Sequence, residues 1–184
     1  MKKLYLLSLL VLLFCIADVD TRAQDANSPY QQISIRLRGA DGKNYDIASL
    51  RGNVVLISFG ATWCQPCKEE LKALEELKRE YKDKPVKFLW ISIESNDQVS
   101  DGDLRDYAKK LKISFPVLRD PETTTFSRFS SRRRLPTILF LDKSGRLSLP
   151  THVGMAAIAL YMSTMRARLD RLLAMKTATV SGGR

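Results

Sequence analysis

Two cysteines separated by two residues are the part of this sequence best suited to chemistry. Cys64 and Cys67 can form a disulfide or react as a pair of thiols, and the dipeptide between them is Gln-Pro. Zinc usually needs four ligands, but no second cysteine pair follows and the only histidine, His152, lies far along the chain. An inert structural disulfide normally closes a longer loop. The spacing therefore favours redox chemistry.

The position of this pair predicts which sulfur attacks. Residues 53–59 are almost continuously apolar, as in a strand buried on both faces, and helical spacing begins at residue 65. Cys64 then stands at a helix N-terminus, where free backbone N–H groups and the helix dipole favour a thiolate. Pro66 suits the first helical turn, because no amide hydrogen is needed there. We expect Cys64 to attack a disulfide and Cys67, one turn further on, to resolve the mixed disulfide.

Alternating strand and helix patterns surround the pair. The chain length of 184 residues suits one domain with a hydrophobic core, and the alternation predicts an α/β fold with parallel strands. A Ser-Gly turn near residue 145 predicts that the last strand pairs antiparallel. The predicted elements are strands at 33–37, 53–59, 86–93, 115–118, 137–142 and 146–149, and helices at 65–81, 100–111 and 158–172.

The first 23 residues have the pattern of a secretory signal. Two lysines precede a largely apolar stretch, residues 4–16, which at ~1.5 Å per residue is well short of the ~30 Å membrane core. We predict cleavage after Ala23, with cleavage after Ala17 and an uncleaved, membrane-tethered form as the alternatives. Either cut removes Cys15 and leaves one dithiol. We expect a periplasmic or otherwise extracytoplasmic product, where disulfide chemistry is available.

The chain divides into four segments, and its net charge is strongly positive. We divide the chain into a signal peptide (1–23), an N-terminal linker (24–32), one domain (33–175) and a flexible tail (176–184). The formal net charge is +10, but no nucleic-acid motif accompanies it, so we expect no nucleic-acid partner. The one tight basic run, residues 132–134, is more typical of a solvated loop than of a binding patch.

Several short motifs, in their usual order, resemble landmarks of a known family. They are Asp41-Gly42-Lys43, Leu50-Arg51-Gly52, Ala61-Thr62-Trp63-Cys64, Cys67 with Glu70, Leu135-Pro136-Thr137, and Asp142 with Gly145. Through them, residues 33–142 resemble the exported thioredoxin-like reductases of the TlpA/ResA type. The resemblance implies a thioredoxin-like fold, with a central mixed sheet flanked by helices and a helix-strand insertion before a cis-proline.

The resemblance also implies roles for residues around the dithiol. Pro136 is the implied cis-proline facing the active site, and the backbone of Leu135 is then free to pair with a substrate strand. Glu94 resembles the family's acidic residue near the dithiol, with a solvated carboxylate that ends a strand as the alternative. Trp63 completes the implied supporting residues. Ser58 stands where thioredoxins proper have a buried acid, so we expect no proton transfer by that route.

Three departures from the family pattern concern local shape. Lys72 replaces a proline that kinks the helix, and Gly60 replaces an aromatic residue. The segment at 132–134 is about one residue longer than usual. None of these changes removes the dithiol.

Together these features predict a protein disulfide reductase that needs no metal or organic cofactor. By resemblance, a membrane thiol-disulfide donor supplies its electrons, its clients are exported proteins that contain disulfides, and cytochrome c maturation is the implied process. We expect a monomer. Because the Gln-Pro dipeptide adds no charge beside Cys64, the expected potential lies nearer thioredoxin, around ~−270 mV, than a strong oxidant at about −120 mV.

Two other functions remain open at this point. The first is a peroxiredoxin, a class of enzyme that carries the motif Pro-x-x-x-Thr-x-x-Cys around its attacking cysteine. The corresponding positions hold Ile57 and Ala61 before Cys64, and Gly60 and Cys64 before Cys67, so neither cysteine satisfies the motif. A periplasmic binding or chaperone module could instead use the groove beside the implied cis-proline without turnover. Catalytic disulfide reduction separates these possibilities.

Overall fold

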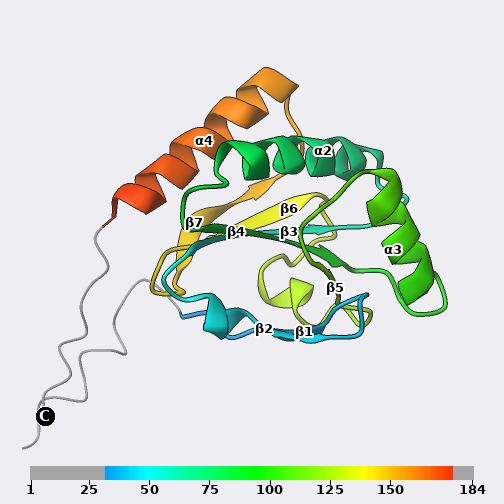
Figure 1. Ribbon diagram of the computed structural model, residues 1–184. Coiled ribbons are helices and arrows are strands. Elements are labelled where there is room, and N and C mark those ends of the chain that lie inside the picture. Colours follow the sequence, from blue (N-terminus) through cyan, green and yellow to red (C-terminus); the bar gives the residue numbers. More distant parts are fainter. Residues whose placement is uncertain (1–31, 176–184) are drawn as a thin grey trace, which may run out of the picture. The chain divides into compact units, whose positions relative to one another are not determined.

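In the computed structural model, which describes residues 32–175, the apolar run before Cys64 forms the central strand of a mixed sheet. The strand order is β5-β4-β3-β6-β7 (Figure 1). β3 pairs parallel with β4, and β4 with β5, whereas β6 pairs antiparallel with β3 and β7. The strands are β3 (Val54–Gly60), β4 (Val86–Ser92), β5 (Val117–Arg119), β6 (Thr137–Leu141) and β7 (Leu147–Val153).

Helices cover one face of this sheet. α2 (Gln65–Glu80) and α4 (Ile158–Ala174) lie side by side there (Figure 1). α3 (Asp101–Lys110) adds Leu104 to the same apolar core. The side chain of Ser100 and that of Asp103 form the capping box that opens α3, as their spacing predicts.

The other face of the sheet is covered by short elements. These are a hairpin of β1 (Arg36–Arg38) and β2 (Asn44–Asp46), and the 3-10 helices η1 (Ile47–Leu50) and η2 (Phe126–Arg128). Their apolar side chains pack with one face of β3 and β4 in a second core. Because β3 faces both cores, all seven of its residues are buried. The strand that leads to the dithiol is therefore held from both sides.

The thioredoxin-like architecture expected from the resemblance is confirmed in its main features. α3 and β5 are the helix-strand insertion that precedes Pro136, and α2 runs through Lys72 as one continuous helix. The strand pattern at 33–37 is only partly right. Ile33 and Ile35 are buried, but strand geometry begins at Arg36, because their backbones bond to Gly145 and Ile47 in loops.

Two strands differ from the sequence prediction. β2 was not predicted, because its sequence Asn-Tyr-Asp is poor in strand-forming residues and its pairing depends on the turn at Gly42, where φ is +83°. β7 extends to Val153, four residues beyond its predicted end. The predicted signal peptide, the linker up to residue 31 and the tail (176–184) lie outside the described residues.

Candidate active site

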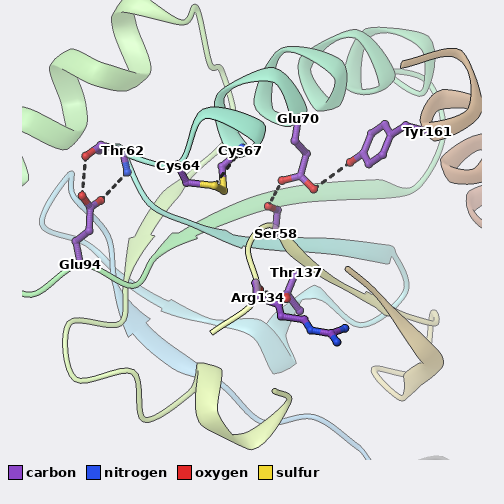
Figure 2. Close-up of a disulfide and its surroundings, with 9 residues drawn as sticks. All are labelled: Ser58, Thr62, Cys64, Cys67, Glu70, Glu94, Arg134, Thr137 and Tyr161. Carbon is purple, nitrogen blue, oxygen red and sulfur yellow. Dashed lines mark hydrogen bonds between the residues drawn. A yellow bond between two sulfur atoms is a disulfide. The ribbon is translucent and has the colours of Figure 1, made fainter. Parts of the chain in front are cut away.

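The two cysteines lie where β3 gives way to α2, and they are joined as a disulfide (Figure 2). Cys64 is the N-cap of α2, and its sulfur accepts a hydrogen bond from the backbone N–H of Cys67 at 3.3 Å. Cys64 is 5% exposed and Cys67 is fully buried. Cys64 thus keeps a small exposed surface at the end of α2, while Cys67 is enclosed by the protein.

The residues that sequence analysis placed around the dithiol frame its open side. Trp63 is 66% exposed, and Pro66 occupies the first turn of α2 in an exposed position. Leu135 is half-buried and packs against Cys64 and Cys67. The Leu135–Pro136 peptide is cis, as the resemblance implies. The structure thus brings these side chains together at the N-terminal end of α2.

Glu94 is buried, unlike the solvated carboxylate of the alternative interpretation, with 3% of its surface exposed. One carboxylate oxygen accepts the backbone N–H of Thr62 at 2.8 Å and the hydroxyl of Ser92 at 3.0 Å. The other accepts the Thr62 hydroxyl at 2.6 Å (Figure 2). Glu94 therefore holds the segment that immediately precedes the Trp63-Cys64 dipeptide.

A second buried carboxyl, that of Glu70, lies one helical turn beyond Cys67 (Figure 2). It accepts hydrogen bonds from the Ser58 hydroxyl on β3 at 2.5 Å and from the Tyr161 hydroxyl on α4 at 3.1 Å. Complete burial disfavours the charged form and raises the pKa of Glu70 to about 8, against the smaller opposing effect of these two hydrogen bonds. Burial and the adjacent Glu70 raise the pKa of Tyr161 in turn.

Glu70 was predicted only as a family landmark and not as a functional residue. Residue 58 itself supplies no acid, as expected. The neighbouring acid comes from α2 and contacts Ser58 directly. A signal was present: Glu70 lies four and seven residues before Leu74 and Leu77, so helical periodicity places it on the buried stripe. A carboxyl on such a stripe needs an explanation.

The segment before the cis-proline carries three arginines, Arg132, Arg133 and Arg134, which we call the arginine triplet. All three are exposed. Their backbone is held in place: the hydroxyls of Ser130 and Thr137 donate to the carbonyls of Arg132 and Arg134 at 2.5 and 2.6 Å. The triplet is therefore a basic loop in a fixed position next to Leu135.

Within residues 32–175, no group of three or more His, Cys, Asp and Glu side chains is arranged to hold a metal ion. No helix in the same range is long and apolar enough to cross a membrane. The disulfide at the N-terminus of α2 is an arrangement that supports thiol-disulfide exchange.

Comparisons with known proteins place this geometry in a family. The model described as the AhpC/TSA family matches residues 22–149. Thiol-disulfide oxidoreductase ResA of Bacillus cereus is 29% identical over 107 residues, which are 58% of this chain and 59% of that protein. Thioredoxin-like protein YneN of Bacillus subtilis is 31% identical over 120 residues, 64% of this chain and 66% of that protein. The matches span less than two thirds of these relatives, and they confirm the resemblance found in the motifs.

Solved structures agree on the fold. The pneumococcal exposed lipoprotein thioredoxin Etrx1 from Streptococcus pneumoniae has a TM-score of 0.59 and 29% identity, covering 73% of this chain and 99% of that one. A thiol:disulfide interchange protein of the thioredoxin family from Chlorobium tepidum has a TM-score of 0.64 and 24% identity, covering 78% and 99%. Both likenesses support the thioredoxin-like fold of this chain.

Proposed function

Because this chain belongs to the AhpC/TSA family and carries a disulfide at a helix N-terminus, we propose that it is a thiol-disulfide oxidoreductase that reduces disulfides of exported proteins. The observation that carries this proposal is the unequal placement of the two sulfurs. Cys64 lies at the rim and caps α2, whereas Cys67 is enclosed one turn further on. That asymmetry suits an attacking and a resolving thiol.

The reaction proceeds in two exchanges. The Cys64 thiolate attacks one sulfur of a client disulfide, where a client is a protein whose disulfide is reduced. A mixed disulfide forms, and the other client sulfur leaves as a thiolate. Cys67, as a thiolate, then attacks the Cys64 sulfur, forms the Cys64–Cys67 disulfide and releases the second client thiolate. Two electrons pass to the client, and the structure shows the oxidised product of this cycle.

Proton transfer belongs to the second exchange, because Cys67 must lose its proton before it attacks. Glu70 is one turn away on the same helix, and its pKa of about 8 lets it bind and release a proton near neutral pH. We assign proton exchange with Cys67 to this carboxyl. Glu94 is proposed to tune the exchange through Thr62, which it holds by two hydrogen bonds.

Partners and location follow from the sequence and the resemblance. The proposed clients are exported proteins with disulfides, and cytochrome c maturation is the proposed setting. Reduction of the Cys64–Cys67 disulfide after each cycle requires an external dithiol, which we propose to be a membrane thiol-disulfide donor. The predicted signal peptide supports a periplasmic or otherwise extracytoplasmic location.

Mixed-disulfide trapping tests the proposal. Cys67→Ser should accumulate client adducts on Cys64, because the resolving thiol is missing, and Cys64→Ser should abolish disulfide reduction. Mass spectrometry identifies the adducts and the cysteine that carries them. Adducts found mainly on Cys67 in the reciprocal variants would reverse the two roles. Stable client binding by the wild-type protein without any disulfide reduction would instead indicate a non-catalytic binding module.

A further inference from the structure

A buried indole N–H without an acceptor lies close to the dithiol. Trp90, on β4, is fully buried, and its Nε1 has no hydrogen-bond partner within the described part of the chain. A buried donor left unpaired destabilises the folded protein, so such a group needs an explanation. Its ring packs on that of Tyr107 at 5.7 Å between centroids, which fixes the indole in place.

The space beside Gly60 brings this N–H and the buried sulfur together. A methyl group placed on Gly60 would lie 2.6 Å from Trp90 Nε1, and 3.4 Å from the Sγ atom of Cys67. Both atoms therefore border the same small volume, which is open because residue 60 has no side chain. A glycine is required here by space, since an alanine would collide with the indole.

We propose that the Trp90 indole N–H donates a hydrogen bond to the Cys67 sulfur once the disulfide is reduced and Cys67 is a thiolate. In the oxidised protein no hydrogen bond joins Nε1 to this sulfur, whereas a thiolate is charged and accepts strongly. Reduction followed by loss of the Cys67 proton therefore supplies a charged acceptor for Nε1. The inference rests on the proposed dithiol function and adds a donor that stabilises the resolving thiolate.

Three titratable groups near Cys67 are the ones to consider, two at α2 and one on α3. Glu70 follows it on α2 and Cys64 precedes it. Behind the indole lies Tyr107 on α3, whose pKa is raised by burial and by the charge of Glu94. None of these groups is a cation. A neutral donor such as the indole is then the side chain best placed to stabilise charge on Cys67.

Nuclear magnetic resonance of the wild-type protein tests this without a core substitution. The chain has two tryptophans, so Trp63→Phe serves to assign the indole signals. The Trp90 Nε1–H resonance should move downfield, and exchange more slowly with solvent, when the reduced protein is taken above the pKa of Cys67. An indole signal that is the same in the oxidised protein and in this thiolate form overturns the proposal.

Thiol titration gives a second, independent measurement. In a Cys64→Ser background, Trp90→Phe should raise the pKa of Cys67 by about one unit, as expected for loss of one hydrogen bond to a charged group. Gly60→Ala should act in the same direction while keeping the indole, because its methyl group separates Nε1 from Sγ. The matched control is Phe88→Leu in the same background, which alters another buried aromatic side chain of β4.

The two hypotheses fail in different ways. Unchanged Cys67 titration in both Trp90→Phe and Gly60→Ala overturns the donor role, whatever the enzyme reduces. A wild-type protein that reduces no client disulfide, yet shows the indole and titration shifts, loses the proposed function and keeps the Trp90–Cys67 hydrogen bond.

A separate observation concerns the arginine triplet. Its three side chains are exposed and form no ion pair within the described residues. The loop backbone is fixed by Ser130 and Thr137 and leads directly into Leu135. A client strand that pairs with the backbone of Leu135 advances ~3.3 Å per residue. Client residues two to four positions from the reacting cysteine then lie ~7–13 Å along the strand from it, about the range over which charges still interact.

We infer from this placement that the triplet favours clients with Asp or Glu two to four residues from the disulfide cysteine. Opposite charges across such a contact raise association rates and select among partners. The loop would then be more than the solvated segment that its sequence suggests, because it leads directly into Leu135, which packs against Cys64 and Cys67. This inference also rests on the proposed function.

Two disulfide peptides that differ only in flanking Asp-Glu or Asn-Gln residues provide the test. The wild-type kcat/KM should be at least about threefold higher for the acidic peptide, from two exposed ion pairs, and added salt should reduce the ratio. Arg132→Gln/Arg133→Gln should abolish the preference. The control Arg79→Gln/Lys82→Gln removes equal charge at the far end of α2 and should retain it.

The peptide experiment distinguishes failure of this inference from failure of the proposed function. A ratio near one in the wild-type protein, or an equal loss in both double variants, overturns the inference. If neither peptide is reduced, the proposed function fails, and the affinities of the same two peptides for the wild-type protein decide the role of the triplet.

Discussion

The buried carboxyl of Glu70 should make this protein less stable as the pH rises. Its pKa is 4.5 in an unfolded chain and about 8 in the folded protein, because burial disfavours the carboxylate. Below pH 4.5 the group is protonated in both states and has no effect. Between pH 4.5 and 8 only the unfolded chain releases the proton, so the free energy of unfolding falls by ~1.4 kcal/mol per pH unit. Above pH 8 the loss stays constant.

The size of the effect follows from the same two pKa values. Relative to acid conditions, Glu70 lowers the free energy of unfolding by about 3 kcal/mol at pH 7 and about 5 kcal/mol at pH 9. Glu70→Gln keeps the shape and one accepting oxygen for the Ser58 and Tyr161 hydroxyls, its NH2 group stands in for the protonated carboxyl oxygen, and it does not titrate. The difference in unfolding free energy between this variant and the wild-type protein should therefore change by about 4 kcal/mol, in favour of the variant, from pH 5 to pH 9.

Urea unfolding at pH 5, 7 and 9 measures this difference. Other shifted carboxyls, such as Asp101, whose pKa is lowered by its hydrogen bond to Arg119, titrate equally in both proteins and cancel. The control is Glu69→Gln, the same substitution at the adjacent, exposed position, which should follow the wild-type profile. Parallel profiles for wild type and Glu70→Gln would refute the reasoning, because the folded protein would then hold Glu70 as a carboxylate.

Three further predictions concern the role of Glu94 in thiol reactivity, the reduction potential, and cleavage of the signal peptide. Glu94→Gln should shift the thiol titration and the exchange rate, because Glu94 holds Thr62 before the dithiol; unchanged values would limit Glu94 to a structural role. The reduction potential, read from tryptophan fluorescence in graded thiol-disulfide buffers, should lie around ~−270 mV, and a value close to −120 mV would make the protein a disulfide donor. N-terminal sequencing of protein from its native host should begin near Gln24. An intact segment 1–16 in the membrane fraction would show a tethered form instead.

The elements around the dithiol could be predicted because their signals are local. The apolar run of β3, the helical spacing of α2 and the capping box of α3 each lie within one short stretch of sequence. The same local signals placed Cys64 at a helix N-terminus. The cis-proline was accessible only through resemblance, since an isolated Leu-Pro dipeptide does not specify its isomer.

The features of the site that could not be predicted from the sequence depend on contacts between residues far apart in the chain. Glu70 becomes a buried acid because Tyr161, 91 residues further on, covers it from α4. Trp90 meets Gly60 only because β3 and β4 pair in a register that sets Gly60 opposite Ser92. No periodicity within one segment carries this information. The sequence therefore predicted the reactive pair more fully than the groups that set its reactivity.

Both of these groups, Glu70 and Trp90, lie on elements next to the second sulfur, that of Cys67. Resolution requires a Cys67 thiolate, but the side chain of Cys67 is fully buried, and a buried thiolate has lost the water that stabilises its charge. A proton acceptor alone would leave that charge unstabilised, and a hydrogen-bond donor alone would leave the proton without a destination. In our proposals, Glu70 on α2 takes the proton and Trp90 on β4 stabilises the charge. The proton acceptor then comes from α2 and the hydrogen-bond donor from β4, so the proposed resolving step depends on how α2 packs against the sheet. Attack by Cys64 depends mainly on the N-terminus of its own helix.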